Sequence, residues 1–160
     1  MSDNPLGHFI LTRSEVDDVF RAHDADSKQS AQSKGPSLTI TEYSPARIVA
    51  RAVATDEHSR RGGMVSGGVI FWFFDALGYM VTLAQSPHGT EALTSDVSIK
   101  FLRPGPVGPF VVEGVPLRFG RRSSVVGITI SSPLISDGPV ASGIITFFPI
   151  FPGDGQPDKT

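Results

Sequence analysis

The sequence predicts an α+β domain in which a six-stranded antiparallel sheet wraps around one long central helix. Two observations carry this prediction. Residues 68–84 form a run of helix length that is apolar on nearly all sides, and such a helix must be buried. Six segments rich in β-branched residues flank it, two before and four after, and short links between them favour antiparallel pairing.

The strands are expected over residues 37–43, 46–55, 92–102, 109–119, 123–132 and 139–149. We expect the last four to form a meander. Asp137-Gly138 in the final link predicts a two-residue hairpin, because both central positions of that turn need positive φ. Pro116 lies inside a predicted strand and lacks a backbone N–H, which predicts an edge or a β-bulge there.

The 160 residues suit one domain with a short segment at each end. We expect residues 1–35 to hold a helix and a mobile loop, residues 36–150 the α+β domain, and residues 151–160 a disordered tail. The helix signal is Ser14 followed by Asp17, a start that resembles a capping box. Apolar residues at helical spacing follow, at Val16, Val19 and Phe20, and the loop is expected over residues 23–36.

Composition excludes several classes of function. The formal net charge of −2 and the pI near 6.0 leave no basic excess for nucleic acid. The chain has no cysteine, so it has no disulfide framework and no thiol nucleophile. The apolar run of 17 residues carries a carboxylate and is shorter than the ~20 residues of a membrane span. No secretory signal opens the sequence, so we expect a cytoplasmic protein without membrane contact.

Asp75 is the only charged residue between Gly68 and Ala84. A carboxylate in apolar surroundings is costly unless it is hydrogen-bonded, neutralised or exposed in a cleft, which makes Asp75 a candidate general base or nucleophile. The structural alternative is that Asp75 faces solvent or a bonded partner on the outside of the helix. Phe71 and Tyr79, four residues to either side, share its face and disfavour that alternative.

Glycines mark the start of the central helix. Four of them, Gly62, Gly63, Gly67 and Gly68, allow close backbone approach and unusual φ values just where the helix begins. A helix start offers unpaired N–H groups and partial positive charge, as an oxyanion requires. The alternative is a plain loop with a glycine-softened helix start. Ser66 does not stand in a G-x-S-x-G elbow, and the four histidines lack zinc-site spacing, so no metal or redox cofactor is expected.

These residues give the chain a resemblance to the hotdog-fold thioesterase superfamily, specifically to acyl-CoA thioesterases of the phenylacetate-pathway type. The resemblance covers roughly residues 36–149. Ser66-Gly67-Gly68 stand at the position of an HGG-like tripeptide, and Asp75 follows nine residues after Ser66. The residues from Thr94 to Pro104 look like the T-x-D-x-x-I-x-F-L-R-P strand of the family.

The resemblance implies hydrolysis of an acyl-CoA thioester, with CoA as part of the substrate and no cofactor. It implies that Asp75 activates or positions water, that the N–H of Gly67 polarises the thioester carbonyl, and that Thr94 holds the acid or the water. The family assembles its sites between two subunits, which implies a homodimer or a homotetramer. It also implies substrate contacts for Gly68 at the helix start and for Arg103, Arg121 and Arg122 near the CoA phosphates. Arg60, in the loop before the helix, is a further candidate for the same anion. The alternative for these arginines is ordinary solvated charge in turns.

Two departures from the family pattern keep an alternative open. Ser66 replaces the usual histidine, and Arg60 replaces a frequent asparagine. The second hypothesis is therefore a non-catalytic hotdog module that binds acyl-CoA or another acyl ligand. A dehydratase needs a paired aspartate and histidine, and the central segment has no histidine to pair with Asp75.

Overall fold

The computed structural model describes residues 10–27 and 35–154. Parts of the predicted loop and tail, residues 28–34 and 155–160, lie outside the described residues. The elements, in chain order, are α1 (Arg13–Ser27), β1 (Leu38–Ser44), β2 (Arg47–Ala54), a 3₁₀ turn (Asp56–His58), β3 (Ser59–Arg60), β4 (Met64–Val65), α2 (Gly67–Ala84), β5 (Glu91–Phe101), β6 (Gly108–Phe119), β7 (Ser124–Ser131) and β8 (Ala141–Ile150).

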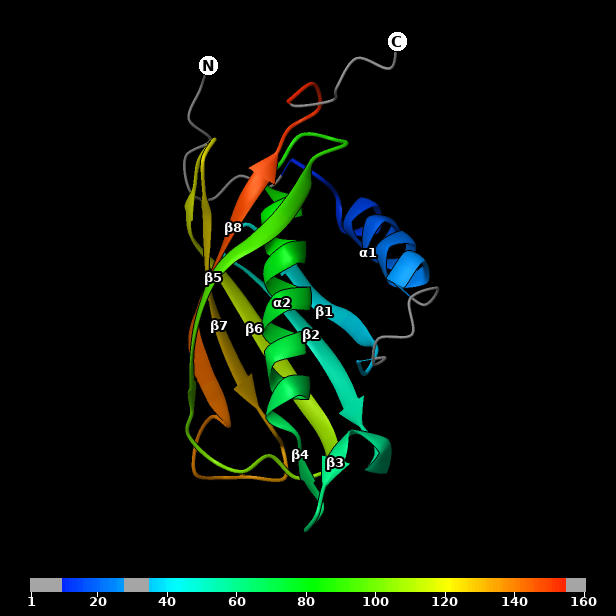
Figure 1. Ribbon diagram of the computed structural model, residues 1–160, viewed down its shortest axis with the longest axis vertical. Coiled ribbons are helices and arrows are strands. Elements are labelled where there is room, and N and C mark those ends of the chain that lie inside the picture. The colour runs from blue at the N-terminus through cyan, green and yellow to red at the C-terminus, as the bar shows by residue number, and fades with distance from the viewer. Residues whose placement is uncertain (1–9, 28–34, 155–160) are drawn as a thin grey trace.

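Six strands form one antiparallel sheet in the order β1-β2-β6-β7-β8-β5, curled around α2 (Figure 1). The predicted six-stranded sheet around a long central helix is therefore confirmed. The short strands β3 and β4 form a separate hairpin directly before α2. Its turn uses Gly62 and Gly63, both at positive φ, so these glycines serve the hairpin rather than the helix start.

The predicted meander of the last four strands is wrong in one respect. β6, β7 and β8 follow one another in the sheet, but β5 pairs with β8 at the edge and not with β6. The link after β5 does not fold back to place β6 beside β5, because its backbone forms hydrogen bonds with other segments of the chain. The N–H groups of Leu102 and Arg103 donate to the carbonyl of Val140 at 2.8 and 3.1 Å, and the carbonyl of Gly105 accepts from Val65 at 2.8 Å.

The two-residue hairpin predicted at Asp137-Gly138 is also wrong. Only Gly138 has positive φ there, whereas the expected turn needs it at both central residues. A longer link connects β7 to β8 instead. The guanidinium of Arg103 donates from Nη1 to the carbonyl of Pro139 at 3.0 Å, and this bond fixes the link in place.

The prediction for Pro116 is confirmed as a bulge. The register between β6 and β7 shifts between Pro116 and Arg118. Because β6 lies between β2 and β7, the proline does not mark an edge; the bulge accommodates its missing donor.

The N-terminal helix forms as predicted, but with other bounds. Its capping box joins Thr12 and Glu15: Thr12 N donates to Glu15 Oε2 at 2.6 Å, and Glu15 N to Thr12 Oγ1 at 3.4 Å. The start therefore precedes the expected Ser14–Asp17 pair. The helix also continues to Ser27, through residues predicted as loop, because no proline or glycine interrupts them.

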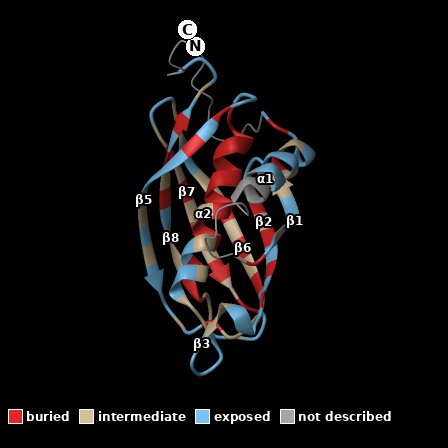
Figure 2. Cartoon of the chain, turned by 45° about the vertical axis from the view of Figure 1, so that its right-hand side comes forward, coloured by how far each residue is buried: buried red, intermediate tan, exposed pale blue. Residues whose placement is uncertain are grey.

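The core lies between α2 and the concave face of the sheet, where Figure 2 shows the buried residues concentrated. Every residue of α2 from Ala76 to Ala84 is buried, whereas its first turns are partly exposed. Among the described residues α2 is the one helix long and apolar enough to cross a membrane, yet 67% of its 18-residue window is buried inside the fold. That burial is typical of a core helix.

Gly78 lets α2 approach β8 closely. A Cβ atom at Gly78 would lie 2.6 Å from Cγ2 of Ile145 and 2.8 Å from Cε2 of Phe147, shorter than any ordinary contact. We predict that Gly78→Ala lowers the free energy of unfolding by about 1–3 kcal/mol, because the helix must move off the sheet.

Gly68→Ala is the matched control, because a Cβ there meets only Ser66 Oγ at 3.9 Å and alanine favours the helix. Urea unfolding should show Gly68→Ala unchanged or up to about 1 kcal/mol more stable. Equal effects of the two substitutions would contradict the close approach at Gly78.

Candidate functional site

The structure brings two of the predicted site residues into direct contact. Thr94, on β5, donates a hydrogen bond from Oγ1 to Oδ1 of Asp75, on α2, at 2.5 Å. Asp75 is half-buried and Thr94 is exposed, so the pair lies where solvent or a ligand can reach it. The carboxylate is thus hydrogen-bonded and accessible at once, which is what a general base requires.

Solvent exposure decreases along the face of α2 that carries Asp75. Phe71, one turn earlier, is 44% exposed, whereas Tyr79, one turn later, is buried. The phenol of Tyr79 donates to Oε2 of Glu91 at 3.0 Å. Burial, with a smaller contribution from the Glu91 carboxylate, raises the pKa of Tyr79. Asp75 therefore stands at the boundary between the buried and open parts of the helix.

The start of α2 presents free N–H groups. Ser66 is the N-cap in extended conformation, its N–H donates to the carbonyl of His58 at 3.0 Å, and its hydroxyl makes no capping hydrogen bond. Within residues 10–27 and 35–154, the N–H groups of Gly67 and Gly68 have no hydrogen-bond acceptor. These donors and the helix dipole together suit a negatively charged oxygen.

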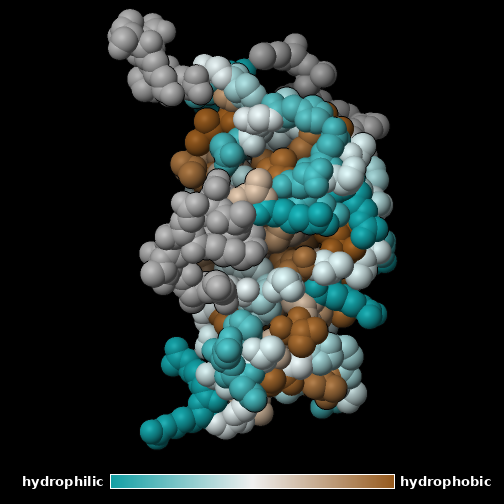
Figure 3. Space-filling view, turned by 90° about the vertical axis from the view of Figure 1, so that its right-hand side faces the viewer, coloured by the Kyte–Doolittle hydropathy of each residue, from teal (hydrophilic) through white to brown (hydrophobic). Residues whose placement is uncertain are grey.

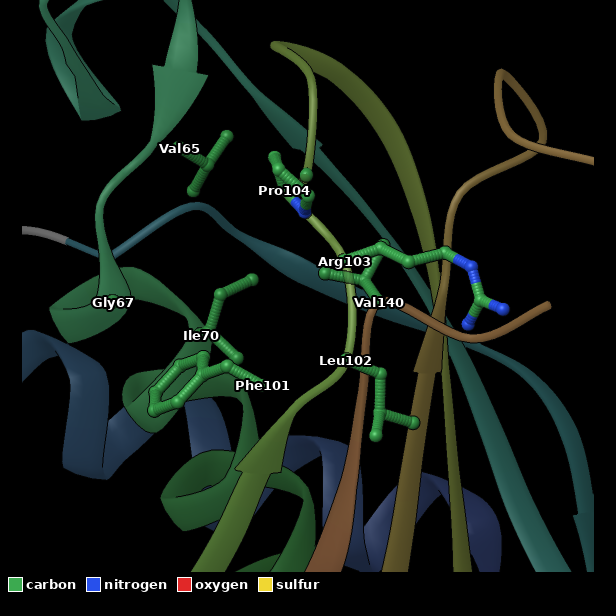
Figure 4. Close-up of a pocket in the computed structure, with 9 residues that line it drawn as sticks. Val65, Gly67, Ile70, Phe101, Leu102, Arg103, Pro104 and Val140 are labelled. Carbon is green, nitrogen blue, oxygen red and sulfur yellow. The ribbon is translucent and has the colours of Figure 1, made fainter. Parts of the chain in front are cut away.

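A pocket of about 320 Å³ opens beside this helix start (Figure 4). Phe101 lies against Gly67, with its ring 3.6 Å from where a Cβ of that glycine would stand. Arg103 is the one charged residue that lines the pocket, and the Arg103 guanidinium points toward the β7–β8 link. The lining residues are otherwise apolar or glycine: Val65, Gly67, Ile70, Phe101, Leu102, Pro104, Gly105 and Val140.

The structure does not bring the predicted arginines together within one chain. Arg103 lies at the pocket and Arg60 is exposed on β3, both at the end of the molecule where α2 begins. Figure 3 shows hydrophilic protrusions beside hydrophobic surface at this lower end. Arg121 and Arg122 lie in the β6–β7 link at the opposite end (Figure 1), where Arg121 pairs with Asp154 at 3.1 Å.

Gly67 and Asp75 are also separate within one chain. Eight positions along one helix correspond to about 12 Å. That distance is too long for one thioester carbon to meet both groups. The carboxylate of Asp75 and the N–H of Gly67 therefore lie at different places on a single chain.

Sequence reasoning missed two sets of residues at this site. It did not select the pocket walls Ile70 and Phe101, although Phe101 precedes Arg103 by two residues in the motif strand. It also missed Ser95, whose hydroxyl donates to the carbonyl of Thr146 at 3.1 Å. The position beside Thr94 was the only available signal for Ser95.

Comparison with known proteins agrees with the fold. The sequence model of the Thioesterase superfamily matches residues 62–133. A candidate esterase of Saccharolobus solfataricus is 32% identical over 91 residues, which cover 57% of this chain and 64% of that protein. A second candidate esterase of that organism is 40% identical over 73 residues, covering 44% of this chain and 47% of that protein. The chain thus spans less than two thirds of the length of either relative.

Two solved structures show the same fold. A candidate thioesterase of Silicibacter sp. TM1040 superposes with a TM-score of 0.76 at 21% identity, covering 91% of this chain and 96% of that one. A Streptococcus mutans protein bound to acetyl-CoA superposes with a TM-score of 0.66 at 21% identity, covering 76% and 95%. The hotdog fold is therefore shown, and the phenylacetate-pathway subtype stays a prediction.

Proposed function

We propose that this chain hydrolyses an acyl-CoA thioester to the free acid and CoA, and the match of residues 62–133 to the Thioesterase superfamily model supports this proposal. The observation that carries the proposal is the accessible carboxylate of Asp75, held by Thr94. The acetyl-CoA bound to the structurally similar Streptococcus mutans protein supports a ligand of the CoA type.

Asp75 has two chemical roles open to it. As general base, it takes a proton from a water molecule that attacks the thioester carbonyl; as nucleophile, it attacks that carbon itself and water then cleaves the anhydride. In both cases the CoA sulfur leaves with the electron pair of the C–S bond. No other side chain of the described residues bonds to Asp75, so the carboxylate keeps capacity for water beside its bond from Thr94.

The N–H of Gly67 is the proposed oxyanion donor. Developing negative charge on the carbonyl oxygen is stabilised most by donors already oriented toward it. Because Gly67 and Asp75 of one chain are too far apart, the proposed complete site combines Asp75 of one chain with Gly67 of a second copy.

The edge strand β5 is the proposed contact between the two copies. It has 11 residues, and among the described strands β8 is its only neighbour in the sheet, so its outer edge is open to pairing there. Pairing of two such edges about a two-fold axis extends the sheet and sets the two α2 helices side by side. We propose a homodimer on this basis, alone or as half of a homotetramer.

A second candidate function rests on Ser66. Its hydroxyl, which stands where the family has a histidine, makes no capping bond, and Arg60 is exposed on β3. A hotdog module without catalysis would bind acyl-CoA or another acyl ligand through the same pocket. Binding of a CoA thioester without thiol release would distinguish this function from hydrolysis.

We predict that Asp75→Asn lowers kcat for thioester hydrolysis about 10²- to 10⁴-fold, because the amide cannot accept the proton from water. The measurement is thiol release from short, long, branched and aromatic acyl-CoAs. Asp96→Asn is the matched control, because Asp96 is an exposed carboxylate on β5, the strand that carries Thr94. Full activity of Asp75→Asn would refute the role of Asp75.

We predict that Gly67→Pro lowers kcat about 10²- to 10³-fold by removing one oxyanion donor. Proline suits this first helical position, and the extended backbone of Ser66 accommodates a following proline. Gly67→Ala keeps the N–H, and its Cβ would make an ordinary 3.6 Å contact with Phe101. Steady-state kinetics should therefore separate the two variants, and equal activity would argue against the N–H of Gly67.

A further inference from the structure

A β-bulge lies in β5 directly beside Thr94. The register of β5 against β8 shifts between Thr94 and Asp96, which makes Ser95 the extra residue. Bulges next to functional sites redirect side chains. The position of this one therefore bears on the orientation of Thr94.

The bulge changes which residues of β5 face the helix. Thr94 is opposite Phe147, and Phe101 is opposite Ala141, both buried residues of β8. Between these two pairs β5 advances seven residues and β8 only six. Directly opposite residues share a face of the sheet, and in an unbroken strand residues seven apart point to opposite faces. Ser95 supplies the one residue that places Thr94 and Phe101 on the same inner face.

Both inner-face residues belong to the proposed site. Thr94 bonds Asp75, and Phe101 lies against Gly67 in the pocket. Without the extra residue, one of them would turn to the outer face of the sheet. The bulge is thus required for Thr94, which bonds Asp75, and Phe101, which lines the pocket, to lie on the same face of β5.

The hydroxyl of Ser95 holds the bulge to the neighbouring strand. Its Oγ donates to the carbonyl of Thr146, on β8, at 3.1 Å. Thr146 pairs with Asp96, the first residue after the bulge. The hydrogen bond therefore joins the extra residue to the strand from which it would otherwise detach.

We propose that Ser95 is a positioning residue whose hydroxyl fixes the bulge that turns Thr94 onto Asp75. The inference rests on the proposed thioester hydrolysis, since positioning is defined there by its effect on the Asp75 carboxylate. Ser95 itself touches neither Asp75 nor the pocket in the described contacts.

The test compares Ser95→Ala with Ser95→Thr, which keeps a hydroxyl. Ser95→Ala should lower kcat about fivefold at unchanged KM, the effect of one lost hydrogen bond on the orientation of Thr94. Ser95→Thr should retain the wild-type kcat. Ser98→Ala, an exposed serine of β5 outside the bulge, is the matched control and should behave as wild type.

A second comparison uses Thr94→Val as background. If Ser95 acts through Thr94, Ser95→Ala should lower kcat no further in that background. Three outcomes would each overturn the proposal. The single variant Ser95→Ala could keep the wild-type kcat, or Ser95→Thr could lose as much kcat as Ser95→Ala. The third is that Ser95→Ala lowers kcat in the Thr94→Val background as much as it does in the wild type.

The inference also has a readout that does not need turnover. The Thr94 methyl resonance in NMR spectra should move in Ser95→Ala and return in Ser95→Thr, with no change in Ser98→Ala. A wild-type protein that hydrolyses no acyl-CoA would contradict the proposed function alone. A Thr94 resonance unmoved in Ser95→Ala would contradict the positioning role, whatever the activity.

Discussion

The burial of one apolar helix constrains the rest of this structure. α2 has a single charged residue in 18 positions, so nearly its whole surface must be withdrawn from water. The curled sheet covers one side, and close contact at Gly78 brings the helix against β8. The segment before α1 crosses the helix end, where Ile10 N donates to the carbonyl of Ala84 at 2.7 Å. The turns left partly open are those that carry Asp75 and the free N–H groups.

The incomplete covering of α2 explains why the candidate site is open along the first turns of the helix. The C-terminal half of α2 is buried, and its first turns lie beside β5, whose outer edge has no partner among the strands that the structure describes. A carboxylate, two backbone donors without an acceptor among residues 10–27 and 35–154, and an apolar pocket lie along this open region. Within one chain the backbone donors lie at the pocket, whereas the carboxylate lies about 12 Å further along the helix. A second copy placed against β5 would cover apolar surface and complete the proposed site in the same contact.

The elements of the fold could be predicted from the sequence because their signals are local. The apolar run fixed the central helix, alternation fixed the strands, and the missing donor of Pro116 indicated its bulge. The position of β5 beside β8 could not be predicted, since it depends on bonds from the link after β5 to distant residues. The same holds for the β7–β8 link, where Arg103 bonds Pro139 across the structure.

Some residues of the candidate site could likewise be predicted from the sequence, and others could not. Asp75 was found because a lone carboxylate stands out in an apolar run, and Thr94 through its motif strand. The arginines were grouped by charge and by resemblance, yet the 12 residues of β6 separate Arg103 from Arg121 and Arg122 by about 40 Å. Ser95 carries no local signal beyond its position beside Thr94, because its bulge is defined by the register of β5 against β8, where Ser95 bonds Thr146, 51 residues away in sequence.

The proposed site combines Asp75 of one chain with Gly67 of another. The most direct test is to co-express Asp75→Asn and Gly67→Pro chains and measure thioester hydrolysis by the mixed population. A shared site predicts recovery to about a quarter of the wild-type rate, since half of randomly formed dimers are mixed and each has one intact site. Activity no higher than that of the separate variants would contradict the shared site.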